Sequence, residues 1–409
     1  MKINMKFGIG VILTAMLLVS LVFVPAVSAQ SGMPDKGQYV NSTNDVSIED
    51  AEEVASYYVR YIPSFMENFQ GWQEATVEQS EVYYDLDGKK SAYAFNVIEN
   101  GQYAGYILVS ATKDNYPILE FSKGKLPNAI TELKATSESV AKEQASKNHL
   151  SIEKATPLYL GGTFYYMEYS LVNSKGNVVD KTLVDLTAPK TTKFNTSQIE
   201  ELFDNKELLK QQQIRKEEAK EQWDSIESRM QDDSEEVVST ASLGWIDGVP
   251  AYEWRAGCSP TASAMVLGYW KDNGYSALPV GNTLIDELAS EMGTYDWPAN
   301  STWPWDIDNG VEAVCDNHEY GSISASNDYS LSWSDTKSEI DNSRPFVLSM
   351  TYGGTGSGHT QEYGMHSVTC MGYSDSTEDY VFIHDTWDEN THHLAFGDWV
   401  AAMGTWVVP

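Results

Sequence analysis

The feature that most constrains the fold is a long central stretch without glycine or proline. Neither residue occurs between Thr196 and Ser242, and positions 198–230 are rich in Glu, Lys, Gln and Arg, with opposite charges at helical spacing. This pattern predicts a long, solvated helix. The acidic, Ser- and Thr-rich positions 232–242 that follow are typical of an exposed linker. The sequence therefore divides into two regions, joined by a charged helix and linker at residues 196–243.

The charge of the chain narrows its possible partners. Among 409 residues there are 59 Asp and Glu against 27 Lys and Arg, a formal net charge of −32. Such a surface repels phosphate groups, which excludes nucleic acid as a partner. Hydrophobic residues make up 42% of the chain, enough to build packed cores, so the sequence predicts a globular protein.

The first residues have the layout of an export signal. Lys2 and Lys6 precede an uncharged run at positions 7–24, and the small residues at 27–29 suit a signal peptidase. We therefore predict a signal peptide at residues 1–29 and a secreted, extracellular protein. The run of about 18 residues also approaches the length that spans a bilayer, so an uncleaved membrane anchor is the alternative.

The region at residues 30–195 is predicted to be an α+β domain. A capping-type sequence at Ser47 opens a helical pattern over 45–69, and alternating apolar runs over 76–121 are separated by turn signals, which predicts an antiparallel sheet. The remaining elements expected here are a helix at 133–147 and strands at 156–160, 164–171 and 181–186.

The chain has three cysteines, Cys258, Cys315 and Cys370, too few for a disulfide scaffold. Whether Cys315 and Cys370 are bridged or simply buried stays open. Cys258 differs from both because it follows Gly257 at the start of a predicted helix, with Pro260 in the first turn. The positive end of a helix favours a thiolate and offers N–H groups to an oxyanion, so Cys258 is a candidate nucleophile. The alternative is that it only packs there.

A thiolate nucleophile needs an imidazole partner, and seven histidines are available. His366 fits best, because it lies on an alternating strand at 365–373, followed by a turn and a second strand at 380–387. In that hairpin Asp385 could accept a hydrogen bond from the imidazole and fix its orientation. His359, in a glycine-rich loop, and the pair at 392–393, placed near a turn, carry little weight.

These motifs resemble a known family. GCSPTASAM, then H-x-V-x-x-x-G-Y, then I-x-D-T-W resemble the papain-like cysteine peptidases, nearest to the peptidase C-39-like branch, over residues 244–409. The resemblance implies Cys258 as nucleophile, His366 as general base and acid, and Asp385 as orienting residue. Residues 92–119 resemble the pro-domain of streptopain-type zymogens, which implies a domain that covers the cleft. A permanent accessory domain is the alternative.

One position departs from the family pattern. The glutamine that helps to form the oxyanion hole of papain-like enzymes is replaced by Tyr252, and no Gln occurs from 244 to 258. The Tyr252 hydroxyl, the Trp254 indole N–H and the Cys258 backbone N–H are the candidate substitutes. If none of them donates, the domain is a weak or inactive enzyme.

The sequence thus predicts an α+β protein with four segments: signal peptide 1–29, α+β pro-domain or accessory domain 30–195, charged helix and linker 196–243, and papain-like domain 244–409, with its Cys-bearing helix packed on an antiparallel sheet. We expect a zymogen that hydrolyses peptide bonds through an acyl-enzyme without metal or other cofactor, its N-terminal domain acting as inhibitor. The alternatives are a non-catalytic module that binds peptides or cell-surface material, and an enzyme acting on another amide.

Overall fold

The computed structural model describes residues 44–187, 205–231, 242–294, 302–351, 365–375 and 378–409. The predicted signal peptide, the linker at 232–241 and the loop that contains His359 lie outside the described residues. Within the described ranges, no helix combines the length and the apolar character needed to cross a bilayer. Below, the N-terminal region means residues 44–187 and the C-terminal region means residues 242–409.

The first helix is shorter than predicted. Helix α1 (Ile48–Tyr61) starts after Ser47, whose hydroxyl accepts a hydrogen bond from the Asp50 N–H at 3.0 Å, so the predicted cap is confirmed. The α-helix ends at Tyr61 and continues as two 3-10 segments, η1 (Ile62–Ser64) and η2 (Glu67–Glu74). Pro63 explains the change, because proline has no N–H to donate and clashes with the preceding turn.

The predicted antiparallel sheet is confirmed. Its strands are β1 (Thr76–Tyr84), β2 (Lys90–Glu99), β3 (Gln102–Ser110) and β4 (Ile118–Ser122), each paired with the next. The turn between β2 and β3 places Asn100 and Gly101 at φ of 51° and 76°. These residue types tolerate left-handed backbone, which is why the sequence signal located the turn.

The rest of the N-terminal region forms a second group of strands under one helix. Its elements are η3 (Pro127–Ala129), α2 (Thr131–Lys147), β5 (Ser151–Tyr159), β6 (Tyr165–Val172) and β7 (Val178–Asp185). Strands β5, β6 and β7 pair antiparallel, whereas β5 meets β1 in a short parallel contact between Leu158 and Tyr84. The sheet is therefore mixed.

The charged central helix has a buried face that the charge pattern did not reveal. Helix α4 (Asn205–Gln231) buries Ala219, Trp223 and Ile226 in an apolar cluster made mostly of residues of the N-terminal region. The Trp223 indole N–H donates to the Asn115 carbonyl oxygen at 2.9 Å. The prediction of a wholly solvated helix is wrong in this respect. The three buried residues follow a spacing of four and three, which is the period of one helix face.

The C-terminal region contains a buried helix on a sheet. Its elements are β8 (Leu243–Trp245), α5 (Cys258–Asp272), α6 (Gly281–Glu291), η4 (Pro304–Asp306), α7 (Ile307–Asn317), β9 (Ser324–Asp328), α8 (Trp333–Asp341), β10 (Phe346–Thr351), β11 (Met365–Asp375), β12 (Asp379–His384), β13 (Thr391–Ala395) and β14 (Ala401–Val408). Strands β11 and β12 pair antiparallel, which confirms the predicted hairpin. Helix α5 is buried along residues 259–270 and packs on β10 and β11.

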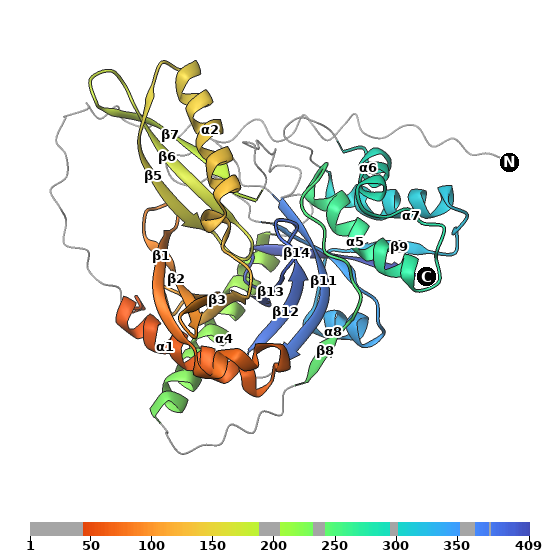
Figure 1. The fold of residues 1–409 in the computed structure, drawn as a ribbon, viewed down its shortest axis with the longest axis horizontal. Coiled ribbons are helices and arrows are strands. Elements are labelled where there is room, and N and C mark those ends of the chain that lie inside the picture. The colour runs from red at the N-terminus through yellow and green to blue at the C-terminus, as the bar shows by residue number, and fades with distance from the viewer. Residues whose placement is uncertain (1–43, 188–204, 232–241, 295–301, 352–364, 376–377) are drawn as a thin grey trace. The chain divides into compact units, whose positions relative to one another are not determined.

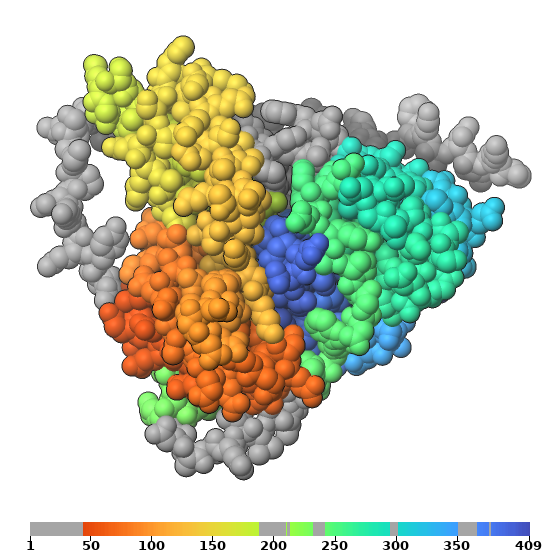
Figure 2. Space-filling view, in the orientation of Figure 1, coloured from red at the N-terminus to blue at the C-terminus, as the bar shows by residue number. Residues whose placement is uncertain are grey.

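One sheet runs through both regions (Figure 1). Its order is β7-β6-β5-β1-β2-β3-β4-β13-β12-β11-β10-β14-β9, and the junction is the antiparallel pairing of β4 with β13. Figure 2 shows the atoms of the C-terminal strands, in blue, directly against those of the N-terminal region. Residues 43–409 form one compact unit. The predicted boundaries at 195 and 243 therefore stay predictions.

Candidate active site

The turn before α5 sets the position of the cysteine. Ala256 and Gly257 have φ of 54° and 121°, and a glycine is needed at the second of these angles. Helix α5 then starts at Cys258 without a side-chain cap. The Thr261 hydroxyl donates to the Gly257 carbonyl oxygen at 2.7 Å, which ties the turn to the first helical residues. The N–H groups of Cys258 and Ser259 lie in the first turn, where no intrahelical acceptor exists.

The structure brings Cys258 and His366 together. Cys258 is half-buried, and its sulfur is hydrogen-bonded to the His366 ring, the Ser367 main-chain N–H and the Ser259 hydroxyl. Burial alone would raise the pKa of the thiol, but these contacts, those of His366 above all, lower it below its ordinary value. These contacts therefore favour the thiolate form of Cys258.

His366 has the complementary shift. Its side chain on β11 is 3% exposed, and its Nε2 lies 3.0 Å from the main-chain carbonyl oxygen of Asp385. That contact leaves Nδ1 for the Cys258 sulfur. Burial lowers the pKa of His366, but the charge and hydrogen bond of Cys258 reverse the effect and raise it. The two groups thus favour a thiolate–imidazolium pair.

Asp385 touches His366 by a different atom from the one expected. Its carboxylate does not face His366: Oδ1 accepts the Trp387 N–H at 3.1 Å, and Oδ2 lies 2.7 Å from Nε2 of His392. Only the main-chain carbonyl of Asp385 reaches His366. The backbone explains the difference, because Thr386 has φ of 79°, a left-handed angle at which the chain reverses direction immediately after Asp385.

Trp387 covers the imidazole. Its ring stacks on that of His366, with centroids 5.8 Å apart and planes at 28°, and meets His392 at 5.5 Å in an edge contact. A third contact joins it to Tyr165 of the N-terminal region at 6.1 Å. Trp387 is 7% exposed, so it shields the His366 ring from water.

The most informative residue that the sequence analysis undervalued is His392. The pair at 392–393 lies near a turn, as predicted, because β13 is a short strand between bends at 386–390 and a turn at 396–397, but both side chains are fully buried. His392 contacts Asp385, Asp388 and Glu120, the last from β4 of the N-terminal region. No sequence signal marks this cluster, since Glu120 and His392 lie 272 positions apart.

A chain of buried hydroxyls behind the nucleophile was also missed. The Ser367 hydroxyl lies 2.9 Å from that of Ser259 and 2.9 Å from that of Ser349. Two positions further along β11, the Thr369 hydroxyl donates to the Ala262 carbonyl oxygen at 2.8 Å. These contacts fix the register of α5 on the sheet, and hence the place of Cys258 beside His366. In the sequence, these hydroxyls were marked only by the alternation of small polar residues along the predicted strand at 365–373.

Of the expected oxyanion donors, Tyr252 is placed elsewhere. Its hydroxyl contacts the main chain of Gly281 and lies beside Gly268, where an added Cβ would be 3.2 Å away. Gly268 is ten positions after Cys258, about 15 Å along the helix axis. The Tyr252 hydroxyl is therefore withdrawn as a donor. Trp254 lies half-buried in the loop before α5 and stays a candidate, as do the first N–H groups of the helix.

The other two cysteines are free and buried, which settles the open question of a bridge. Burial raises the pKa of Cys315 and of Cys370 to about 12. Both thiols are therefore protonated at neutral pH, and Cys258 alone is suited to nucleophilic chemistry.

One group of described residues has the composition of a metal site. Asp385, Asp388 and His392 offer ligand atoms within 4.8 Å of one another. Both ring nitrogens of His392 face carboxylates, Nε2 toward Asp385 and Asp388 and Nδ1 toward Glu120 at 3.2 Å. A protonated imidazole forms ion pairs with all three acids, and its Nε2 hydrogen bond goes to Asp388 while Oδ2 of Asp385 accepts none, so the cluster is explained as an ion-pair network.

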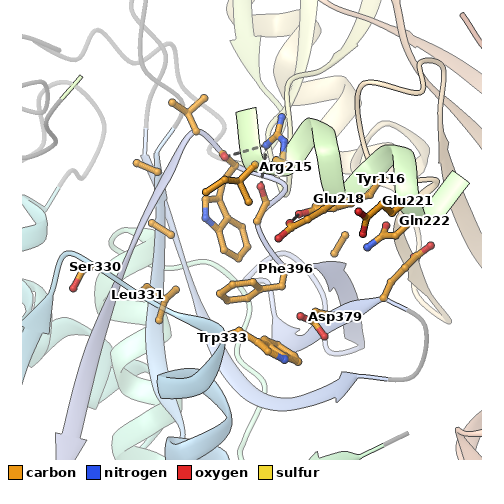
Figure 3. A pocket seen from close by; sticks show the side chains of 18 of the residues that line it. Tyr116, Arg215, Glu218, Glu221, Gln222, Ser330, Leu331, Trp333, Asp379 and Phe396 are labelled. Atoms are coloured by element: carbon orange, nitrogen blue, oxygen red, sulfur yellow. Dashed lines mark hydrogen bonds between the residues drawn. The ribbon is translucent and has the colours of Figure 1, made fainter. Parts of the chain in front are cut away.

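A pocket of about 590 Å³ lies away from these residues (Figure 3). Its walls combine the rings of Trp333, Phe396 and Trp399 with acidic residues of α4, including Glu218. Arg215 closes one side by donating to the carbonyl oxygens of Gly397 and Trp399. None of the predicted site residues lines this pocket. The candidate active site is therefore placed at Cys258 because of its contact with His366 and its lowered thiol pKa, and not because of a large cavity.

A half-buried cysteine at a helix start, beside a histidine of the adjoining sheet, is the arrangement that a thiol nucleophile requires. Residues 246–404 match the family model described as the Peptidase_C39 like family, which confirms the resemblance drawn from the motifs. The mixed α+β fold with its large sheet is consistent with a papain-like peptidase.

Other comparisons add little. Among solved structures, the chain is similar to a fragment of prointerpain A from Prevotella intermedia, with 12% identity and a TM-score of 0.36, over 81% of this chain and 98% of that chain. A likeness at this level carries no argument about function. A comparison with curated proteins found no match.

Proposed function

We propose that the protein is a secreted cysteine peptidase made as a zymogen, in which Cys258 attacks peptide bonds with His366 as its acid and base. The observation that carries this proposal is the contact between the Cys258 sulfur and the His366 ring, with the pKa of the thiol lowered and that of the imidazole raised. The match of residues 246–404 to a peptidase family supports the same conclusion.

The proposed reaction has two stages. The Cys258 thiolate adds to the carbonyl carbon, and the oxyanion that forms faces the free N–H groups at the start of α5. The His366 imidazolium gives its proton to the leaving amine, which leaves an acyl-enzyme thioester. Neutral His366 then takes a proton from water as the water attacks the thioester. The acid product leaves, and Cys258 and His366 return to their first states.

The zymogen part of the proposal rests on the N-terminal region. Asp185, at the end of β7, is near enough for its charge to raise the pKa of His366. Leu183, Phe164 and Tyr166 lie in the same apolar cluster as residues of α5 and β11. The N-terminal region thus lies against the site, as an inhibitory segment would. Cleavage in the linker at 232–243 would loosen this restraint without detaching the N-terminal region, and residues 1–29 would direct export.

A non-catalytic module that binds peptides is the second candidate. The missing glutamine and the displaced Tyr252 hydroxyl favour it, because losing one oxyanion donor lowers kcat by about 100- to 1000-fold. An enzyme that acts on another amide would keep the same pair and differ only in substrate.

Replacement of Cys258 separates these functions. We expect the linker-cleaved protein to hydrolyse a fluorogenic peptide library and Cys258→Ala to lose that activity. Cys315→Ala removes a buried thiol and is the matched control, expected to remain active. Peptide binding without hydrolysis, equal in the wild type and Cys258→Ala, would instead establish the binding module. Hydrolysis of non-peptide amides alone would establish the third function.

A further inference from the structure

We propose that His392 is a positioning residue of the Cys258–His366 site and that Glu120 of the N-terminal region holds it in place. This inference rests on the proposed function for its meaning in catalysis. The contacts that carry it, however, can be tested through the reactivity of the Cys258 thiol alone. They form a continuous line from Cys258 through His366, Asp385 and His392 to Glu120.

The first link is the contact that orients His366. Its Nε2 lies 3.0 Å from the main-chain oxygen of Asp385, so the direction of the ring depends on where that carbonyl points. The next residue, Thr386, is β-branched and has φ of 79°, a left-handed angle that such a residue rarely adopts. Such a backbone persists only if its surroundings hold it. Something must therefore fix residues 385–388.

The second link is what fixes them. The Asp385 carboxylate accepts the Trp387 N–H at 3.1 Å and lies 2.7 Å from Nε2 of His392. Asp388, three residues on, lies 3.1 Å from the same nitrogen. Both acidic side chains of the reversed segment thus converge on one imidazole. His392 itself is held by the main-chain pairing of β13 with β12 and β4.

The third link comes from the N-terminal region. Nδ1 of His392 lies 3.2 Å from Oε1 of Glu120 and 2.8 Å from the Tyr106 hydroxyl. Oε2 of Glu120 accepts the Tyr165 hydroxyl at 2.8 Å, and Oε1 accepts that of Tyr106. Glu120 and His392 are both fully buried. Each oxygen of Glu120 therefore has a partner, and His392 cannot rotate without losing contacts on both sides.

The charges around His392 explain why a neutral replacement should disturb residues 385–388. The groups that face it are Glu120 and Tyr106 from one side, Asp385 and Asp388 from the other, the neighbouring His384, and the Trp387 ring. His392 is the cation of this set. Without it, the Asp385 carboxylate would be buried opposite Asp388 with no positive charge between them, and residues 385–388 would move apart.

A consequence follows for the N-terminal region. It supplies Glu120 and pairs β4 with β13, so it supports the site as well as lying against it. Cleavage of the linker should then leave the N-terminal region bound to the C-terminal region. Linker-cleaved protein should migrate as one complex in gel filtration without denaturant.

The test compares His392→Gln with His393→Gln, with alkylation followed in the full chain and kinetics measured on the linker-cleaved protein. His393 is the matched control, because it lies on the same buried strand but stacks on Phe121 and has no contact with Asp385. Alkylation of Cys258 by iodoacetamide, followed by mass spectrometry from pH 5 to 9, reports the thiolate. We expect His392→Gln to slow alkylation at pH 6 about tenfold and to move its midpoint to higher pH, with a lower kcat and unchanged KM.

Glu120→Gln removes the charge that faces His392 and keeps an acceptor oxygen for one of the two tyrosines, so it should give a smaller shift in the same direction. Thermal melting checks that the variants fold. If His392→Gln does not fold, Glu120→Gln decides the outcome. A wild-type alkylation profile in the folded variants would overturn the proposal, as would an equal shift in His393→Gln. Altered alkylation of the wild type after chelation would replace it with a metal site. Shifted alkylation in a protein without peptidase activity would uphold the positioning role and reject the proposed function.

Discussion

His366 and His392 lie close to one another, touch the same tryptophan, and have opposite surroundings. His366 faces a sulfur and a main-chain carbonyl oxygen, whereas His392 faces three carboxylates. Burial lowers the pKa of both imidazoles. Cys258 raises that of His366 above its ordinary value, and Asp385, Asp388 and Glu120 raise that of His392 well above it.

The difference between these surroundings indicates which of the two imidazoles is suited to transfer a proton during catalysis. In the proposed reaction, the main partner of His366 is a thiolate whose charge disappears on acylation, so the imidazolium loses its support when it must give up its proton. The partners of His392 keep their charge throughout the reaction. His392 therefore suits a fixed cation, and His366 suits a group that cycles.

The largest effect is expected from removing the cycling imidazole. His366→Asn should lower peptidase activity by about 10³- to 10⁴-fold and move the midpoint of Cys258 alkylation to higher pH, because the thiolate loses its charge partner. Rates of peptide hydrolysis and alkylation across pH measure both changes. The control is His318→Asn, since His318 pairs with Glu287 outside the site. An unchanged alkylation midpoint in His366→Asn would show that His366 does not stabilise the Cys258 thiolate, and its contrast with His392 would then be wrong.

A second prediction concerns Glu378, a buried acid whose hydrogen-bond partners are tyrosines and not an imidazole. Burial raises the pKa of Glu378 to about 7, with Tyr58 and Tyr380 as its hydrogen-bond donors. The native state then holds a proton that the unfolded state has lost between about pH 4.5 and 7, so this group makes stability fall as pH rises through that window.

Glu378→Gln has no such proton to lose. We expect the stability of the variant relative to the wild type to increase between pH 5 and pH 8 by at most about 3 kcal/mol. Urea unfolding at the two pH values measures the difference. The same pH dependence in both proteins would show that Glu378 does not titrate in this range. A buried carboxylate of this protein could then stay charged with tyrosine donors alone, without a cation such as His392.

The third prediction addresses the residue shared by the two histidines. Asp385→Asn keeps the carbonyl that orients His366 and an oxygen for the Trp387 N–H, but it removes the charge facing His392. We expect about a tenfold loss of kcat, and about a hundredfold loss in Asp385→Ala. Steady-state kinetics separates the two. Equal losses in both variants would mean that the carboxylate charge, not the oxygen position, carries the effect.

The smallest effect is expected at the hydroxyl chain. Ser259→Ala removes a hydrogen bond to Ser367 and one that lowers the pKa of Cys258. Stability should fall by about 1 kcal/mol, and the alkylation midpoint should rise slightly. Denaturant unfolding and the alkylation profile measure these changes. A loss as large as that of His366→Asn would show that the chain acts directly on the nucleophile.

Much of the fold could be predicted because its signals are local. The Ser47 cap, the turn at Asn100 and Gly101, and the hairpin of β11 and β12 follow from residues a few positions apart. Helix α4 shows the limit. Its charges indicated solvent, while Trp223 packs on a region about a hundred residues earlier in the chain, which the charge pattern did not indicate.

The candidate site divides in the same way. Spacing and residue type led to Cys258 and His366, whereas Tyr252 was chosen only because it occupies the place of a glutamine. The structure directs its hydroxyl to Gly281. The position of His392 near a turn did not reveal its buried contacts, because the pairing of β13 with β4 joins two regions, and no local pattern encodes such a pairing.

The sequence by itself determined that a cysteine begins a helix behind a glycine turn and that a histidine stands on a hairpin strand, because backbone angles and side-chain periods act over a few residues. Only the tertiary structure decided that Asp385 meets His366 through its backbone and that Glu120 and His392 share a buried contact. Those contacts depend on two regions closing into one sheet, where burial strengthens charge pairing that water would otherwise weaken.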